Sequence, residues 1–123
     1  MRHKPITPRA HGMLDYATAG ATALVSRLLG FSPPAARTAR LWAAGYSALS
    51  ALTNYPLAVK GAVPFKAHGP MDAVMAPLIP ALPWLLGFAR DRRARNFFLA
   101  LAAITVVVTA LTDWSTEPEP SGA

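Results

Sequence analysis

The chain has 123 residues, enough for one domain, and sets a hydrophobic fraction of 53% against a charged fraction of only 15%. A soluble domain of this size needs more charge to cover its large relative surface. The absence of cysteine excludes disulfides, thiolate metal sites and a cysteine nucleophile. The net charge is +6, but the basic residues gather between apolar blocks and form no continuous face, so we expect no nucleic-acid partner.

Four apolar blocks, each separated from the next by a charged break, follow one another along the chain. They are Met13–Leu29, Leu41–Val59, Met71–Phe88 and Phe97–Leu111. A helix needs about 17 to 20 residues to cross a bilayer, so the predicted fold is all-α, a bundle of four transmembrane helices. The first block also fits a signal peptide, but Asp15 at its head and Arg27 inside its end favour a retained helix.

An internal repeat groups the four blocks into two helix pairs. The segment His11-Gly12-Met13-Leu14-Asp15 recurs as His68-Gly69-Pro70-Met71-Asp72, and Leu28-Leu29-Gly30-Phe31 recurs at the same offset as Leu85-Leu86-Gly87-Phe88. A unit with two crossings begins and ends on one side of the membrane, so the two pairs are predicted to be parallel. Both His-Gly-x-x-Asp segments are then expected on one face and both Leu-Gly-Phe turns on the other.

The repeat also predicts how the chain is divided. We expect a basic N-terminal segment (1–10), a first helix-pair repeat (11–57), a connecting loop (58–67), a second helix-pair repeat (68–114) and an acidic, disordered tail (115–123).

The motifs of each unit suggest a family. After the His-Gly-x-x-Asp start, the second unit has Pro83-Trp84-Leu85-Leu86-Gly87-Phe88, and the two units end in Leu52-Thr53-Asn54-Tyr55 and Leu111-Thr112-Asp113-Trp114. Over about residues 10–114 the chain resembles the SPW-repeat family of small bacterial membrane proteins. It departs from the family at Leu82, where serine is usual, and at Arg27, where tryptophan is usual. The resemblance implies a four-helix membrane domain of uncharacterised function and carries over no catalytic residue.

Two histidine–aspartate pairs are the sharpest candidates for a polar site. His11 and Asp15, like His68 and Asp72, are spaced so that both side chains share one helix face. Ionisable groups within membrane segments are often functional. The alternative is structural: Asp72 follows Pro70 closely, and a carboxylate in a first helical turn stabilises free N–H groups. No third type of ligand is evident, so we expect no metal and no cofactor.

The tryptophans and the basic clusters bear on membrane placement. Trp42, Trp84 and Trp114 lie near block ends and are predicted to form an interfacial aromatic belt. Five Lys and Arg lie on the side of the N-terminus and seven on the side of the short turns, which leaves the orientation almost balanced.

We expect a multi-pass protein of the bacterial inner (plasma) membrane without enzymatic activity. Its expected role is structural or interactive, with the lipid bilayer and a second copy or another membrane protein as partners. The alternative is a small transporter, channel component or proton- or redox-handling protein that uses the His-Gly-x-x-Asp cluster.

Overall fold

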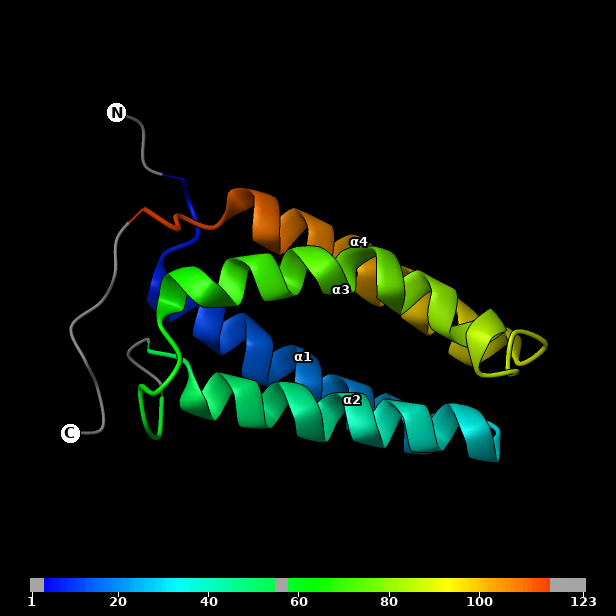
Figure 1. Ribbon diagram of the computed structural model, residues 1–123. Helices are drawn as coiled ribbons and strands as arrows, with labels where there is room; N and C mark the ends of the chain where they lie inside the picture. The colour runs from blue at the N-terminus through cyan, green and yellow to red at the C-terminus, as the bar shows by residue number, and fades with distance from the viewer. Residues whose placement is uncertain (1–3, 55–57, 116–123) are drawn as a thin grey trace.

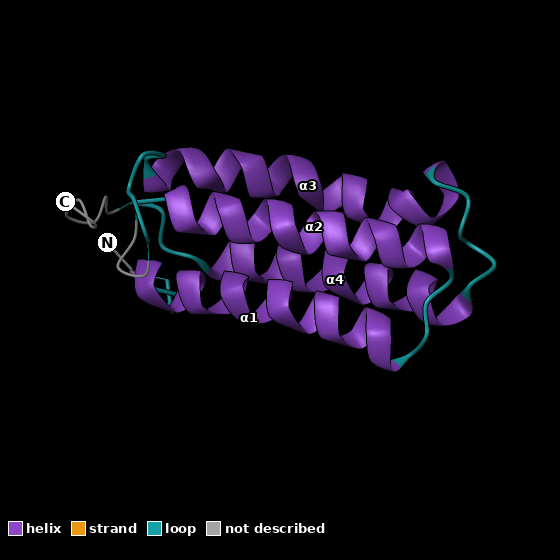
Figure 2. Ribbon diagram, turned by 90° about the horizontal axis from the view of Figure 1, so that it is seen from below, coloured by secondary structure: helices purple, strands orange, loops and turns teal. Residues whose placement is uncertain are grey.

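A computed structural model describes residues 4–54 and 58–115, which form four α-helices and no β-strand. The helices are α1 (Pro8–Leu28), α2 (Pro33–Leu52), α3 (Phe65–Leu85) and α4 (Arg92–Leu111). The all-α prediction is confirmed. α1 packs along α2 and α3 along α4, the pairs that the repeat predicts. Both pairs begin at the same end of the bundle, where the α2–α3 connection also lies, and both tight turns lie at the other end (Figures 1 and 2).

The turn end is fixed by glycine and by one aspartate. Gly30 and Gly87 follow α1 and α3 with φ of 59° and 77°, a left-handed conformation that side chains other than glycine rarely adopt. Asp91 precedes α4 and accepts hydrogen bonds from the backbone N–H of Ala94 (3.2 Å) and of Ser32 in the other turn (2.7 Å). Burial opposes ionisation of Asp91, but these hydrogen bonds outweigh it and lower its pKa below the ordinary value.

The helices do not have the bounds of the apolar blocks. α1 and α3 both begin before their blocks, so α3 starts inside the segment expected to be a loop, and Pro70 lies within the helix instead of at its first position. α2 ends at Leu52, before the end of its block. The apolar blocks included only the apolar part of each helix. α1 and α3 also include the buried polar residues His11 and His68, which come before the blocks. The expected disordered tail falls, from residue 116 onward, outside the described residues.

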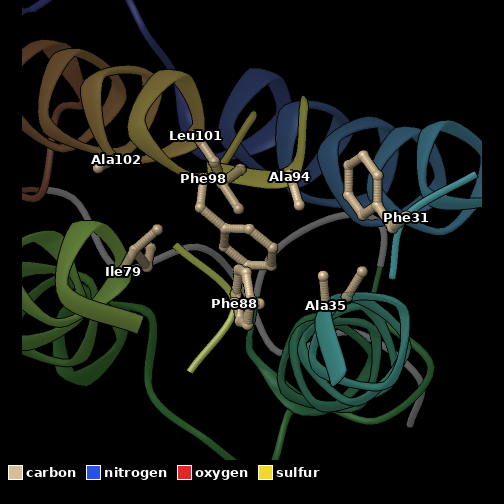
Figure 3. Packing of buried hydrophobic residues seen from close by; sticks show 9 residues of the cluster. Phe31, Ala35, Ile79, Phe88, Ala94, Phe98, Leu101 and Ala102 are labelled. Carbon is tan, nitrogen blue, oxygen red and sulfur yellow. The ribbon is translucent and has the colours of Figure 1, made fainter. Parts of the chain in front are cut away.

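The apolar core joins the two helix pairs near the turn end (Figure 3). Its members come from both pairs: Phe31, Ala35, Ala39, Ile79, Phe88, Ala94, Phe98, Leu101 and Ala102. By length and hydropathy, α4 is the one helix among the described residues that could cross a membrane, and only 22% of its apolar window is buried. The hydropathy of α1, of α2 and of α3, each taken alone, falls below that of a span.

Candidate functional site

The two histidine–aspartate pairs converge at the end of the bundle opposite the core. Nε2 of His11 lies 3.3 Å from Oδ2 of Asp15 and 3.2 Å from Oδ2 of Asp72. Nε2 of His68 lies 3.0 Å and 3.2 Å from the same two oxygens. Both imidazole rings are fully buried, and the side chains of Asp15 and Asp72 are 12% and 4% exposed. These four side chains are called here the His/Asp centre. Their Nε2 and Oδ2 atoms form a closed ring in which histidine and aspartate alternate.

The interpretation of the aspartates as helix caps is wrong. Neither α1 nor α3 has an acidic residue in its first turn, because α1 begins at Pro8 and α3 at Phe65. Asp15 and Asp72 therefore lie well inside their helices, where the backbone N–H groups already have intrahelical partners. The aspartates are placed to meet the histidines, and not to satisfy the start of a helix.

Two threonines fix the orientation of the histidine rings. Nδ1 of His11 lies 2.9 Å from Oγ1 of Thr112, and Nδ1 of His68 lies 3.0 Å from Oγ1 of Thr53. Each threonine hydroxyl donates to the carbonyl four residues earlier, at 2.6 Å, so its oxygen accepts from the histidine. This network assigns the Nδ1–H to the threonine side of each ring and turns both Nε2 atoms towards the aspartates.

The threonine contacts cross between the two repeats. His11 of the first unit bonds Thr112 at the end of the second, and His68 of the second bonds Thr53 at the end of the first. Short backbone bridges hold both threonines at equivalent places, Ile6 with Thr112 and Thr53 with Val63. The candidate residues predicted from sequence did not include these threonines, although the repeated Leu-Thr-Asn/Asp-aromatic ending contained the signal. The centre therefore needs both units to be complete.

Aromatic side chains enclose the His/Asp centre. Tyr46 on α2 donates a hydrogen bond of 3.0 Å to Oδ1 of Asp72. The ring of Trp114 lies with its centroid 4.9 Å from that of His11 and stacks on Phe65 at 4.7 Å. Gly69 permits this approach, because a Cβ there would meet the indole at 3.1 Å. Trp114 thus covers the centre from the end of the bundle.

The other two tryptophans lie away from the centre. Trp84 is 59% exposed near the end of α3. Trp42 lies in the middle of α2 instead of near a helix end, because α2 begins at Pro33, and it stacks on Tyr46 with a centroid distance of 4.6 Å.

A small cavity of about 20 Å³ adjoins the two aspartates, and Tyr46 and Thr105 lie on its wall. A space of this size holds about one water molecule, and the polar atoms on its wall can bind it. Asp15 is the most exposed member of the centre and lines this cavity together with Asp72.

The arrangement offers two imidazole nitrogens and two carboxylate oxygens within 4.8 Å of one another. Such a set can hold a cation between its members or exchange protons among them. Opposite charges alternate around it, and this balance is what a weakly polar environment requires of buried ionisable groups.

Comparison of the chain with protein-family models, curated proteins and solved structures gives no match. The resemblance to the SPW-repeat family therefore stays a prediction.

Proposed function

We propose that the chain is a multi-pass protein of the bacterial inner membrane that binds a cation at the His/Asp centre. The observation that carries the proposal is the convergence of four buried ionisable side chains, two from each repeat, at one end of an otherwise apolar bundle. The proposal favours the alternative in which the His-Gly-x-x-Asp cluster is functional over a purely structural role.

The exposed surface of the helices supports a lipid environment. Large apolar side chains are exposed along all four helices, among them Leu24 (57%), Leu41 (67%), Val74 (65%) and Val106 (52%). Soluble monomers rarely expose apolar surface on this scale. A helix satisfies most of its backbone groups internally, which is the condition for contact with lipid. The four prolines inside α3 are exceptions, because each removes one intrahelical hydrogen bond. The basic side chains of the α3–α4 turn, Arg90, Arg92, Arg93 and Arg95, would then meet lipid headgroups.

The energetics favour a functional role for the centre over a stabilising one. Burying ions is costly, and a well-packed apolar set of the same volume usually stabilises a fold as well or better. The chain already joins its two pairs through the apolar core at the turn end. A second, ionisable junction at the other end is therefore not required for packing, whereas a cation site requires charged ligands that are held in place.

Membrane fractionation and cation binding together test the proposal. The full chain should stay in the membrane pellet through alkaline extraction and leave it only with detergent. After equilibrium dialysis of the purified protein against a panel of cations, elemental analysis should find one bound ion per chain. The double variant Asp15→Asn/Asp72→Asn should lose that ion, and Asp113→Asn, outside the centre, should retain it. A chain that binds no cation under any of these conditions would leave the structural role as the better account.

A further inference from the structure

We propose that the His/Asp centre is a tetrahedral site for one divalent transition-metal ion of the zinc class. The ligands are Nε2 of His11, Nε2 of His68 and one carboxylate oxygen each from Asp15 and Asp72. This inference rests on the proposed cation-binding function and adds the identity of the ion and its geometry.

The four nitrogen–oxygen separations match the edges of a tetrahedral ion's ligand shell. Zinc binds imidazole nitrogen and carboxylate oxygen at about 2.0 to 2.1 Å, which places neighbouring donors of a tetrahedron about 3.3 Å apart. The four nitrogen-to-oxygen separations in the centre are 3.3, 3.2, 3.0 and 3.2 Å. All four residues offer donor atoms within 4.8 Å of one another. The four histidine–aspartate pairs are therefore already at tetrahedral spacing. The N–N and O–O pairs lie within 4.8 Å and would have to close by at most about 1.5 Å around a bound ion.

The neighbours of the ligands are those that metal sites use. A ligating histidine nearly always donates its other ring N–H to a fixed acceptor, which sets the tautomer and the ring orientation. Thr112 and Thr53 supply that acceptor for His11 and His68. Tyr46 engages Oδ1 of Asp72 and leaves Oδ2 directed at the histidines. Three of the four ligands are thus held with one atom facing the centre.

Donor type and charge select the class of ion. Magnesium and calcium prefer six or more oxygen ligands, whereas a mixed set of two imidazoles and two carboxylates suits zinc and its first-row neighbours. Two carboxylates neutralise one divalent cation, so the occupied site carries no net charge beside the apolar rings of Phe65 and Trp114.

Calorimetry and cobalt spectroscopy on the detergent-purified full chain test the inference. We expect one Zn²⁺ per chain and no competition from millimolar Mg²⁺ or Ca²⁺. Co²⁺ should give the intense visible absorption of a tetrahedral complex, and Zn²⁺ should displace it. His68→Gln and Asp72→Asn should each weaken Zn²⁺ binding by more than about 100-fold, because loss of a ligand exceeds loss of a supporting hydrogen bond. Asp113→Asn, the same change as Asp72→Asn but outside the centre, should leave binding unchanged.

Two further measurements keep the inference falsifiable if a ligand variant does not fold. Thr112→Val keeps all four ligands and removes one supporting acceptor, so it should weaken Zn²⁺ binding by about 10- to 100-fold while the tetrahedral cobalt spectrum remains. A weak, octahedral cobalt spectrum, or stronger binding of Mg²⁺ or Ca²⁺, would overturn the zinc-class assignment and leave cation binding intact. A chain that binds none of these ions would overturn both.

Discussion

Replacing Asp72 alone should destabilise the protein far more than replacing the whole His/Asp centre. Asp72 is 4% exposed. Its Oδ1 accepts a hydrogen bond from Tyr46 at 3.0 Å, and its Oδ2 lies 3.2 Å from Nε2 of His11 and 3.2 Å from Nε2 of His68. In Asp72→Leu, the two buried imidazoles keep only one of the two carboxylates beside them, that of Asp15. The hydroxyl of Tyr46 loses its hydrogen-bond acceptor. Removing one partner from a buried charge group costs about 3–5 kcal/mol.

Replacing all four members of the centre by leucine removes every buried charge together. Such replacements are commonly neutral or stabilising, so we expect the quadruple variant to lie within about 2 kcal/mol of the parent in the absence of metal. Thermal unfolding in detergent, followed by circular dichroism, measures both variants. For a chain of this length 1 kcal/mol corresponds to roughly 3–6 °C, so Asp72→Leu should lower Tm by roughly 10–30 °C.

The comparison of these two variants has a clear refuting result. If the quadruple variant is destabilised at least as much as Asp72→Leu, the centre stabilises the fold and our energetic argument for function fails. If Asp72→Leu lowers the free energy of unfolding by less than about 1 kcal/mol, the Asp72 carboxylate does not form a strong buried ion pair with the histidines in solution.

Three further predictions concern the cover of the centre, the turn end and proton release. The Cβ of Gly20→Ala would meet open space, so this variant should stabilise α1 by about 0.5–1 kcal/mol. The Cβ of Gly69→Ala would have to displace the indole of Trp114 by a few tenths of an ångström. Gly69→Ala should therefore be less stable than Gly20→Ala in the same melting assay. Asp91→Ala should cost about 1 kcal/mol through loss of the α4 cap. The pKa of Asp91 is lower in the folded state than the ordinary 3.8. The difference in stability between the parent and Asp91→Ala should therefore be largest above about pH 4 and should shrink as the pH falls below it. Titration of Zn²⁺ in buffers of different ionisation enthalpy should report about two protons released per ion, because a proton held on each Nε2 between the carboxylates must leave when the metal binds. Release of none would mean that both Nε2 atoms are unprotonated in the metal-free protein.

The helix pairing and the meeting of the two histidine–aspartate pairs could be predicted from the sequence. Both follow from the repeat, because equal units in parallel bring His11 and His68 to the same end of the bundle. The sequence pattern could not give the helix starts. The residues before Met13 and Met71 include polar side chains and lie outside the apolar blocks, although Thr7 caps α1 and His11 and His68 are buried in the bundle.

The capping interpretation failed for the same reason as the helix starts. With α3 assumed to begin at Pro70, Asp72 fell in a first turn; with α3 beginning at Phe65, Asp72 faces His68 across one turn of helix interior. The exchange of threonines between units was also beyond the sequence pattern. It depends on the ends of α2 and α4 crossing to the opposite pair, and the repeat fixes order along the chain without fixing which unit each end contacts.

X-ray absorption at the zinc edge, on the detergent-purified protein loaded with one equivalent of Zn²⁺, tests the central claim most directly. We predict a single shell of four nitrogen and oxygen donors at about 2.0 Å, with the multiple-scattering signal of two imidazoles. The double variant His11→Gln/His68→Gln should lose the imidazole signal. A six-donor shell without imidazole scattering in the unaltered chain would contradict the account.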